Sequence, residues 1–122
     1  MLYHVVVFMV LTGLAHSYLG ERYILVRLFK RDALPKVLGS TAFTAGTLRF
    51  AWHLTTLAWW CLAYLVLIVA QGTFTESHAL RAIGISAVVS AFFPLYFTRG
   101  KHLSWVVFAV VGALLLVAAS ER

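Results

Sequence analysis

The sequence predicts an all-α, polytopic membrane protein with four transmembrane helices in an antiparallel bundle. Hydrophobic residues make up 62% of the 122-residue chain and charged residues only 11%, whereas soluble domains contain roughly 45–50% apolar and about 25% charged residues. Four apolar stretches recur along the chain, each close to the roughly 20 residues that a helix needs to cross a bilayer. Together these observations predict one transmembrane domain, residues 1–122, that lipid solvates.

The predicted spans cover about residues 2–19, 50–70, 78–97 and 103–119. Residues 20–49 form the one long connection, and two patterns occur in it. Apolar residues alternate with basic ones over 22–31, which predicts a short amphipathic helix at the lipid headgroups. Small residues over 37–48 predict an extension that leads into the second span. The connections after residues 70 and 97 are short, so they make spans two, three and four antiparallel neighbours.

The charges predict an orientation. Eight of the ten basic residues lie in or beside residues 20–49 and 99–101, which the topology places on one side of the membrane. The positive-inside rule assigns that side to the cytoplasm. Both termini are then periplasmic in a bacterial inner membrane. Because orientation accounts for the net charge of +6, we expect no nucleic-acid partner. The first span has no basic region before it and no small-residue cleavage motif after it, so we expect it to be retained.

The most informative stretch runs from Arg49 to Trp60, at the start of the second span. Arg49, His53 and Thr56 follow helical spacing and share one face. Polar groups inside a membrane are costly unless something faces them, so they mark candidate sites. The topology brings three histidines, His16, His53 and His102, to the same cytoplasmic-side depth, level with Arg49 and Glu21. We expect this His/Arg polar layer to be the candidate site.

Several ligands suit such a layer. Imidazoles with the Glu21 carboxylate would bind a transition metal, with Thr56 or Glu21 orienting the rings. Two facing histidines would instead hold a b-type haem, and four tryptophans would supply flat walls: Trp52, Trp59, Trp60 and Trp105. The third option is recognition of a small anion or anionic lipid by four basic residues, namely Arg49, His53, Arg99 and Lys101. The alternative to all three is interfacial anchoring, which is common for histidine and tryptophan. At ~100° per residue, Glu21 points about 140° away from His16, so the two share a site only if the helix breaks at Gly20.

Three segments, His16-Ser17-x-Leu19-Gly20-Glu21, Arg49 to Thr55 (RFAWHLT) and Gly100 to Trp105 (GKHLSW), resemble small four-helix inner-membrane proteins of bacteria. The resemblance covers most of the chain. It implies the inner membrane as the setting and draws attention to His16, Glu21, Arg49, His53 and His102, but it implies no activity.

Catalysis receives little support, because no acidic pair occurs at helical spacing and no glycine-rich phosphate loop is present. The leading hypothesis is therefore a non-catalytic membrane protein whose His/Arg layer binds a metal, haem or small ligand. The alternative is an accessory subunit that packs against a larger membrane complex. A small-molecule channel or transporter is the third hypothesis. Membrane lipids are the expected partners, together with a membrane protein or further copies of this chain.

Overall fold

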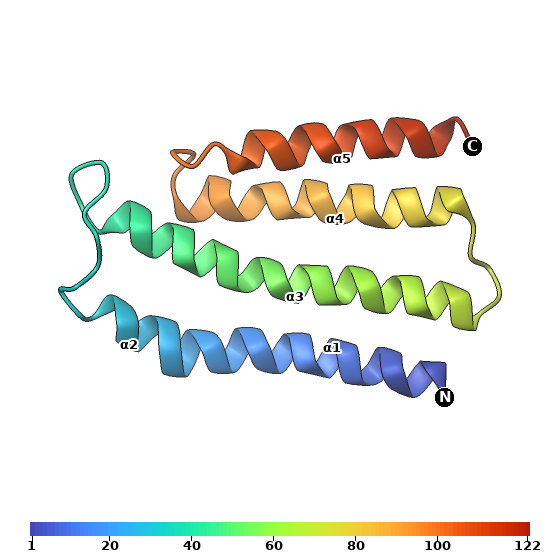
Figure 1. Ribbon diagram of the computed structural model, residues 1–122, viewed down its shortest axis with the longest axis horizontal. Helices are drawn as coiled ribbons and strands as arrows, with labels where there is room; N and C mark the ends of the chain where they lie inside the picture. Colours follow the sequence, from blue (N-terminus) through green and yellow to red (C-terminus); the bar gives the residue numbers. More distant parts are fainter.

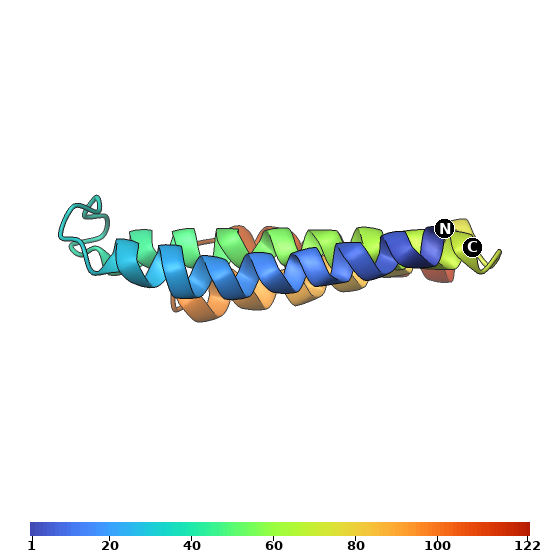
Figure 2. The same cartoon turned by 90° about the horizontal axis from the view of Figure 1, so that it is seen from below.

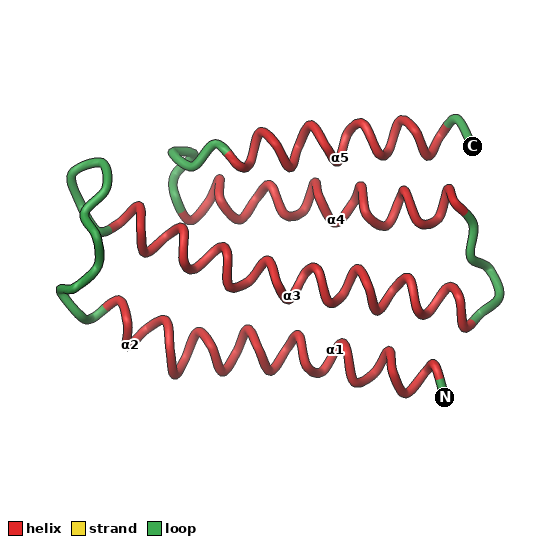
Figure 3. The backbone as a smooth tube through the Cα atoms, viewed as in Figure 1, coloured by secondary structure: helices red, strands yellow, loops and turns green.

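The computed structural model describes residues 1–122, and all of its regular secondary structure is helical (Figures 1 and 3). Helix α1 covers Leu2–Leu19 and continues without a break through a π-helix, η1 (Gly20–Leu25), into the short α2 (Val26–Phe29). After a connection come α3 (Ala42–Ala70), α4 (Glu76–Phe97) and α5 (Ser104–Ser120). The all-α prediction is confirmed.

Three of the helices are long and apolar enough to cross a membrane: Leu2–Phe29, Ala42–Ala70 and Glu76–Phe97. The fourth, α5, is also apolar but has only 17 residues. The helices extend further into residues 20–49 than the expected spans do, because α1 continues to Phe29 and α3 already begins at Ala42. What remains is a short loop with one isolated bridge between Val37 and Ser40. A continuing helix satisfies its own backbone hydrogen bonds, which favours these extensions over irregular chain.

The helices lie side by side in the order α1, α3, α4, α5, and each runs antiparallel to its neighbour (Figure 1). Seen from below, the molecule is thin, so the four helices form one layer (Figure 2). The predicted bundle is therefore not closed: α1 and α5 occupy opposite edges, and the main contacts join α1 to α3, α3 to α4 and α4 to α5. Short connections make neighbours, but nothing in the sequence returns α1 to α5. Lipid chains are as apolar as leucine, so burying apolar surface does not drive closure in a membrane.

The two ends of the layer differ in what they carry. Both termini and the α3–α4 turn lie at one end, and the α2–α3 connection and the α4–α5 turn lie at the other (Figure 1). Small residues bring the helices together between these ends. Gly112 of α5 lies against the backbone of α4 at Gly84, and Gly46 of α3 lies against the carbonyl of Phe97. Such close approaches are the usual way for membrane helices to gain packing contacts.

Candidate functional site

The helices α1 and η1 present a stripe of small and polar residues to α3, namely Gly13, Ser17, Gly20 and Glu21. The two glycines make room for tryptophans of α3, because a Cβ at Gly13 would collide with the ring of Trp60 and one at Gly20 with the ring of Trp52. The indole N–H of Trp52 donates to the carbonyl of His16 at 3.0 Å. The close approach of the two helices lets the short Ser17 side chain and the Glu21 carboxylate reach α3.

Glu21 lies in the first turn of the π-helix. The helix persists past Gly20, and Glu21 accordingly makes no hydrogen bond or ion pair with His16. The carboxylate is held instead by two residues of α3. Arg49 contacts it with two nitrogens, Nη2 to Oε1 at 2.8 Å and Nε to Oε2 at 3.2 Å. The Nε2 of His53 lies 3.1 Å from Oε2. π-Helical turns are rare and occur frequently at functional sites, so this turn adds weight to the cluster.

The chain of contacts continues from His53 toward the middle of α1. The Nδ1 of His53 lies 2.9 Å from the hydroxyl of Ser17, and this hydroxyl lies 2.6 Å from that of Thr56. The hydroxyl of Thr56 donates to the carbonyl of Gly13 at 3.0 Å. We call the five side chains the Glu21 cluster; its members are Ser17, Glu21, Arg49, His53 and Thr56.

The hydrogens available to this chain limit which groups can donate. Thr56 must donate to Gly13, because a carbonyl oxygen only accepts, and His53 must donate to an ionised Glu21. Ser17 then has one hydrogen for two contacts, with Thr56 and with Nδ1 of His53. Ser17 can donate to Nδ1 of a neutral His53, with the hydrogen of Thr56 shared between Gly13 and Ser17. The contacts are therefore compatible with a neutral imidazole.

The order hydroxyl, imidazole, carboxylate also occurs where serine acts as a nucleophile. Two features of the cluster disfavour that role here. The hydroxyl of Ser17 lies between two helices and also contacts Thr56. The surrounding N–H groups belong to a continuous helix and make its internal hydrogen bonds, whereas acyl transfer needs free donors to hold an oxyanion. The geometry therefore favours binding over catalysis.

The three histidines of the predicted layer do not meet. The ring of His16 stacks on Trp52 with centroids 4.6 Å apart, and its Nε2 lies 3.0 Å from the hydroxyl of Thr55. The ring of His102 packs against Phe43 and Phe50, with Nδ1 2.8 Å from Ser104. No group of three histidine, cysteine or acidic side chains in the structure is placed to hold a metal ion. The convergence on which the metal hypothesis depended is thus absent, because the rings face different neighbours.

The tryptophans proposed as cofactor walls are also dispersed. Trp52 covers Gly20, whereas Trp60 covers Gly13 and donates to the carbonyl of Val10 at 3.3 Å. Trp59 is exposed on the surface of α3. Trp105 donates to the carbonyl of Gly100 at 3.2 Å, within its own turn. Three of the four indoles thus bond to nearby backbone, and the structure assembles no flat-walled haem cavity from them.

Glu21 is accessible from outside the layer. The wall of a surface pocket there includes both Ser17 and Glu21. The pocket has a volume of about 730 Å³ and also includes Arg22 and Arg27. Neither arginine forms an ion pair; both guanidinium groups lie over the ring of Tyr23, at 5.8 and 5.7 Å from its centroid. Side chains of Glu21 and Arg49 are 34% and 32% exposed. A small ligand approaching from this side would meet the Glu21 carboxylate and two free cations.

Sequence reasoning identified Glu21, Arg49, His53 and Thr56 and missed Ser17. The available signal was the spacing Gly13, Ser17, Gly20, which places three small residues on one helical face toward a partner helix. No protein-family model matches the chain, and no curated protein or solved structure matches it.

Proposed function

We propose that the protein is an integral protein of the bacterial inner membrane that crosses it four times, as a single domain, with the end that carries Glu21 in the cytoplasm. The distribution of charge supports this placement: that end holds eight of ten basic and two of four acidic residues, so it carries the whole net charge of +6. Positive charge concentrates on cytoplasmic connections. Only 15 of 122 residues are buried within the chain, as expected where lipid covers the rest.

Labelling from the two sides of the membrane tests the placement. With Cys61 replaced by alanine, a cysteine at Lys36 should react with an impermeant maleimide only from the cytoplasmic side, and a cysteine at Ser120 only from the periplasmic side. Reaction of both from one side would contradict the four-span topology.

The molecular function we propose is binding of a small ligand that bears a carboxylate or phosphate group, at the Glu21 cluster. The observation that carries it is the arrangement around Glu21: a guanidinium contacting both carboxylate oxygens, and an imidazole contacting one. Paired guanidinium nitrogens are the donor set that recognises carboxylates and phosphates. The Glu21 carboxylate therefore occupies the position between Arg49 and His53 in which an external anion would bind, and we call this position the anion seat. Because Glu21 is partly exposed, another anion can replace it there.

The surroundings of the seat support exchange. Arg22 and Arg27 line the adjoining pocket without acidic partners, so an anion that displaces Glu21 enters a positive environment. A metal or haem at this place finds less support, because the ring nitrogens of His53 face Ser17 and Glu21 and no third ligand is near.

Calorimetric titration of the protein in nanodiscs with inorganic phosphate and with citrate tests the proposal. Arg49→Gln should abolish the binding, because it removes the paired donors. Glu21→Gln should tighten it by about tenfold, since the competing charge is gone, a change worth roughly 1.4 kcal/mol. Arg99→Gln is the control, a cation at the same end outside the cluster. If neither the wild type nor Glu21→Gln binds either anion, the Glu21–Arg49 pair only joins two helices and the proposal is wrong.

The second candidate function is an accessory subunit, and the open layer favours it. Both broad faces of a single layer of helices are left to lipid or to another protein, and large exposed apolar surfaces are typical of such contacts. Chemical cross-linking in native membranes followed by purification should then recover one recurring partner. A channel would need several copies of the chain, because one layer cannot surround a pathway.

A further inference from the structure

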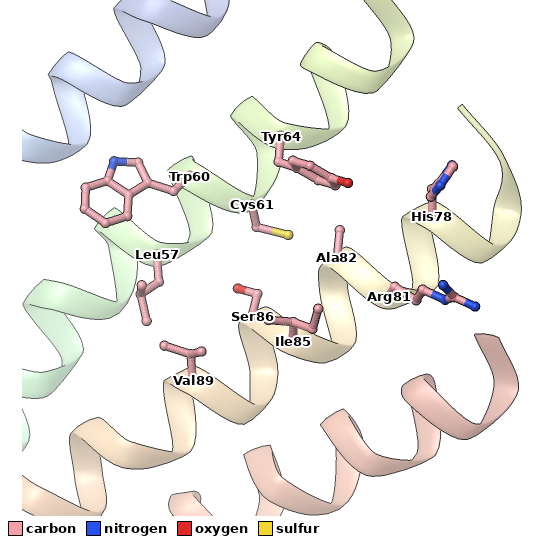
Figure 4. A pocket seen from close by; sticks show the side chains of 10 residues that line it. All are labelled: Leu57, Trp60, Cys61, Tyr64, His78, Arg81, Ala82, Ile85, Ser86 and Val89. Carbon is pink, nitrogen blue, oxygen red and sulfur yellow. The ribbon is translucent and has the colours of Figure 1, made fainter. Parts of the chain in front are cut away.

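A groove separates α3 and α4 in the half of the layer that is remote from the Glu21 cluster (Figure 4). Its volume is about 510 Å³, and seven of its ten lining residues are hydrophobic. Leu57 and Cys61 form part of one wall and Ile85 part of the other (Figure 4). The groove stays open because α4 contributes the small Ala82 here, which does not fill the space opposite Cys61.

The basic lining residues lie toward one end of the groove, and Ser86 is the one other polar residue in the lining. His78 and Arg81 lie there, toward the end of the layer that holds the termini, with Tyr64 of α3 facing them (Figure 4). The Nδ1–H of His78 donates to the carbonyl of Thr73 at 2.8 Å, because a carbonyl oxygen only accepts. Arg81 has no ion pair and no hydrogen bond. It differs in this from Arg49, which is paired with Glu21 at the other end.

The dimensions of the groove match one leaflet of a bilayer. From Arg81 to Val89 the helix rises ~12 Å at 1.5 Å per residue, and half of a hydrocarbon core is roughly 15 Å. An apolar channel of that depth, with a cation at its membrane-surface end, is complementary to a lipid: an acyl chain fits the channel and an anionic head meets the guanidinium.

We propose that this groove binds one anionic phospholipid of the periplasmic leaflet, with its phosphate at Arg81 and one acyl chain beside Cys61. An anionic headgroup suits Arg81 better than a zwitterionic one, because a choline or ethanolamine group carries a cation of its own that competes for the phosphate. The hydroxyl of Tyr64, which also lines the groove, offers a neutral donor. The proposal rests on the membrane placement above but is independent of anion binding at the Glu21 cluster.

Cys61 supplies a reporter inside the groove, because it is the only cysteine in the chain. We would attach bimane to it and place the protein in phosphatidylcholine nanodiscs. One tenth of the lipid would be a tail-brominated quencher, either phosphatidylglycerol or phosphatidylcholine. Quenching should be about threefold stronger with the anionic lipid, which corresponds to one ion pair of modest strength. Arg81→Gln should abolish this preference and Arg81→Lys should retain it.

Arg122→Gln is the matched control, because Arg122 lies at the same end but is paired with Glu76. It should leave the preference unchanged. Equal quenching by the two lipids would show ordinary boundary lipid and overturn the proposal. So would a loss of preference in Arg122→Gln equal to that in Arg81→Gln, since general surface charge would then explain it.

Native mass spectrometry of the unlabelled protein provides a second measurement, in case bimane itself fills the groove. The wild type and Arg122→Gln should retain one more phosphatidylglycerol than Arg81→Gln. Equal retention by all three would contradict the proposal. The cytoplasmic cations are unchanged in these variants, so loss of anion binding at Arg49 would not alter the result.

Discussion

The contacts at the two edges of the layer are built differently. At one edge α5 meets α4 through glycines, so that the backbone of one helix touches the other: a Cβ on Gly112 would lie 2.8 Å from the carbonyl oxygen of Gly84 and 2.9 Å from the amide of Val88. At the other edge α1 meets α3 through side chains, with the tryptophans on glycines and the Glu21 cluster between the helices. The first contact depends mainly on shape, with one hydrogen bond from Ser77 to the carbonyl of Ala119 and one exposed ion pair, Glu76 with Arg122. The second depends on hydrogen bonds and charge. Only the second exposes chemistry that a ligand could use.

The largest effect should come from disturbing the backbone contact. Gly112→Ala places a methyl group 2.6 Å from Val88 and against two backbone atoms, and a backbone yields only if the helices separate. Overpacking of this kind costs about 1–3 kcal/mol. Unfolding in nanodiscs by SDS titration should show this loss. Gly13→Ala should cost less, since its methyl group meets only side chains, those of Trp60 and Thr56.

The control for this comparison is Ala113→Val, next to Gly112 but exposed on α5. It should leave the free energy of unfolding unchanged. If Gly112→Ala behaves like Ala113→Val, then α5 is not held to α4 by the close backbone approach.

A smaller effect is expected from the hydroxyl pair of the other edge. Thr56→Val keeps the shape of the side chain and removes its bonds to Ser17 and Gly13. Hydrogen bonds between membrane helices contribute about 0.6 kcal/mol each and at most about 1.7, so the loss should be near 1 kcal/mol. A double-mutant cycle with Ser17→Ala measures the coupling between the two hydroxyls. Thr47→Val is the matched control, because the hydroxyl of Thr47 bonds within α3, to Phe43; additive effects of Ser17→Ala and Thr56→Val would contradict the polar contact.

The same difference explains how much the sequence could predict. Apolar length and basic clustering act locally, so the four helices and the two ends follow from the sequence. Helix order and facing depend on contacts between distant residues, so the sequence predicted antiparallel helices but not their arrangement in one open layer. His53 and Glu21 were identified by their depth, but their meeting requires the stripe of small residues on α1. The groove beside Arg81 could not be predicted from the sequence. It exists because small side chains of α4 face α3, and the sequence does not show which residues of the two helices face each other.

The two Arg–Glu pairs allow the smallest and sharpest test. Glu76 and Arg122 join the chain end to α4, and their side chains are 74% and 58% exposed. Glu21 and Arg49 are about one-third exposed, and Glu21 also bonds to His53. Exposed pairs contribute little, because water and salt screen them and the side chains lose freedom in pairing. We therefore expect Glu76→Gln to change the free energy of unfolding by less than about 0.5 kcal/mol, and only at low salt.

Glu21→Gln should destabilise the protein more than Glu76→Gln, and raising the salt concentration should not remove the difference. The substitution leaves the partly buried guanidinium of Arg49 without a carboxylate partner. An unpaired charge in such a position lowers the stability of the folded protein. An added anion that occupies the vacated seat should recover part of that loss, because a ligand that binds only the folded state stabilises it. SDS titration with and without inorganic phosphate measures this recovery. Recovery in Glu76→Gln as well would point to a general effect of the salt, whereas recovery in Glu21→Gln alone ties the stability of this edge to the anion seat.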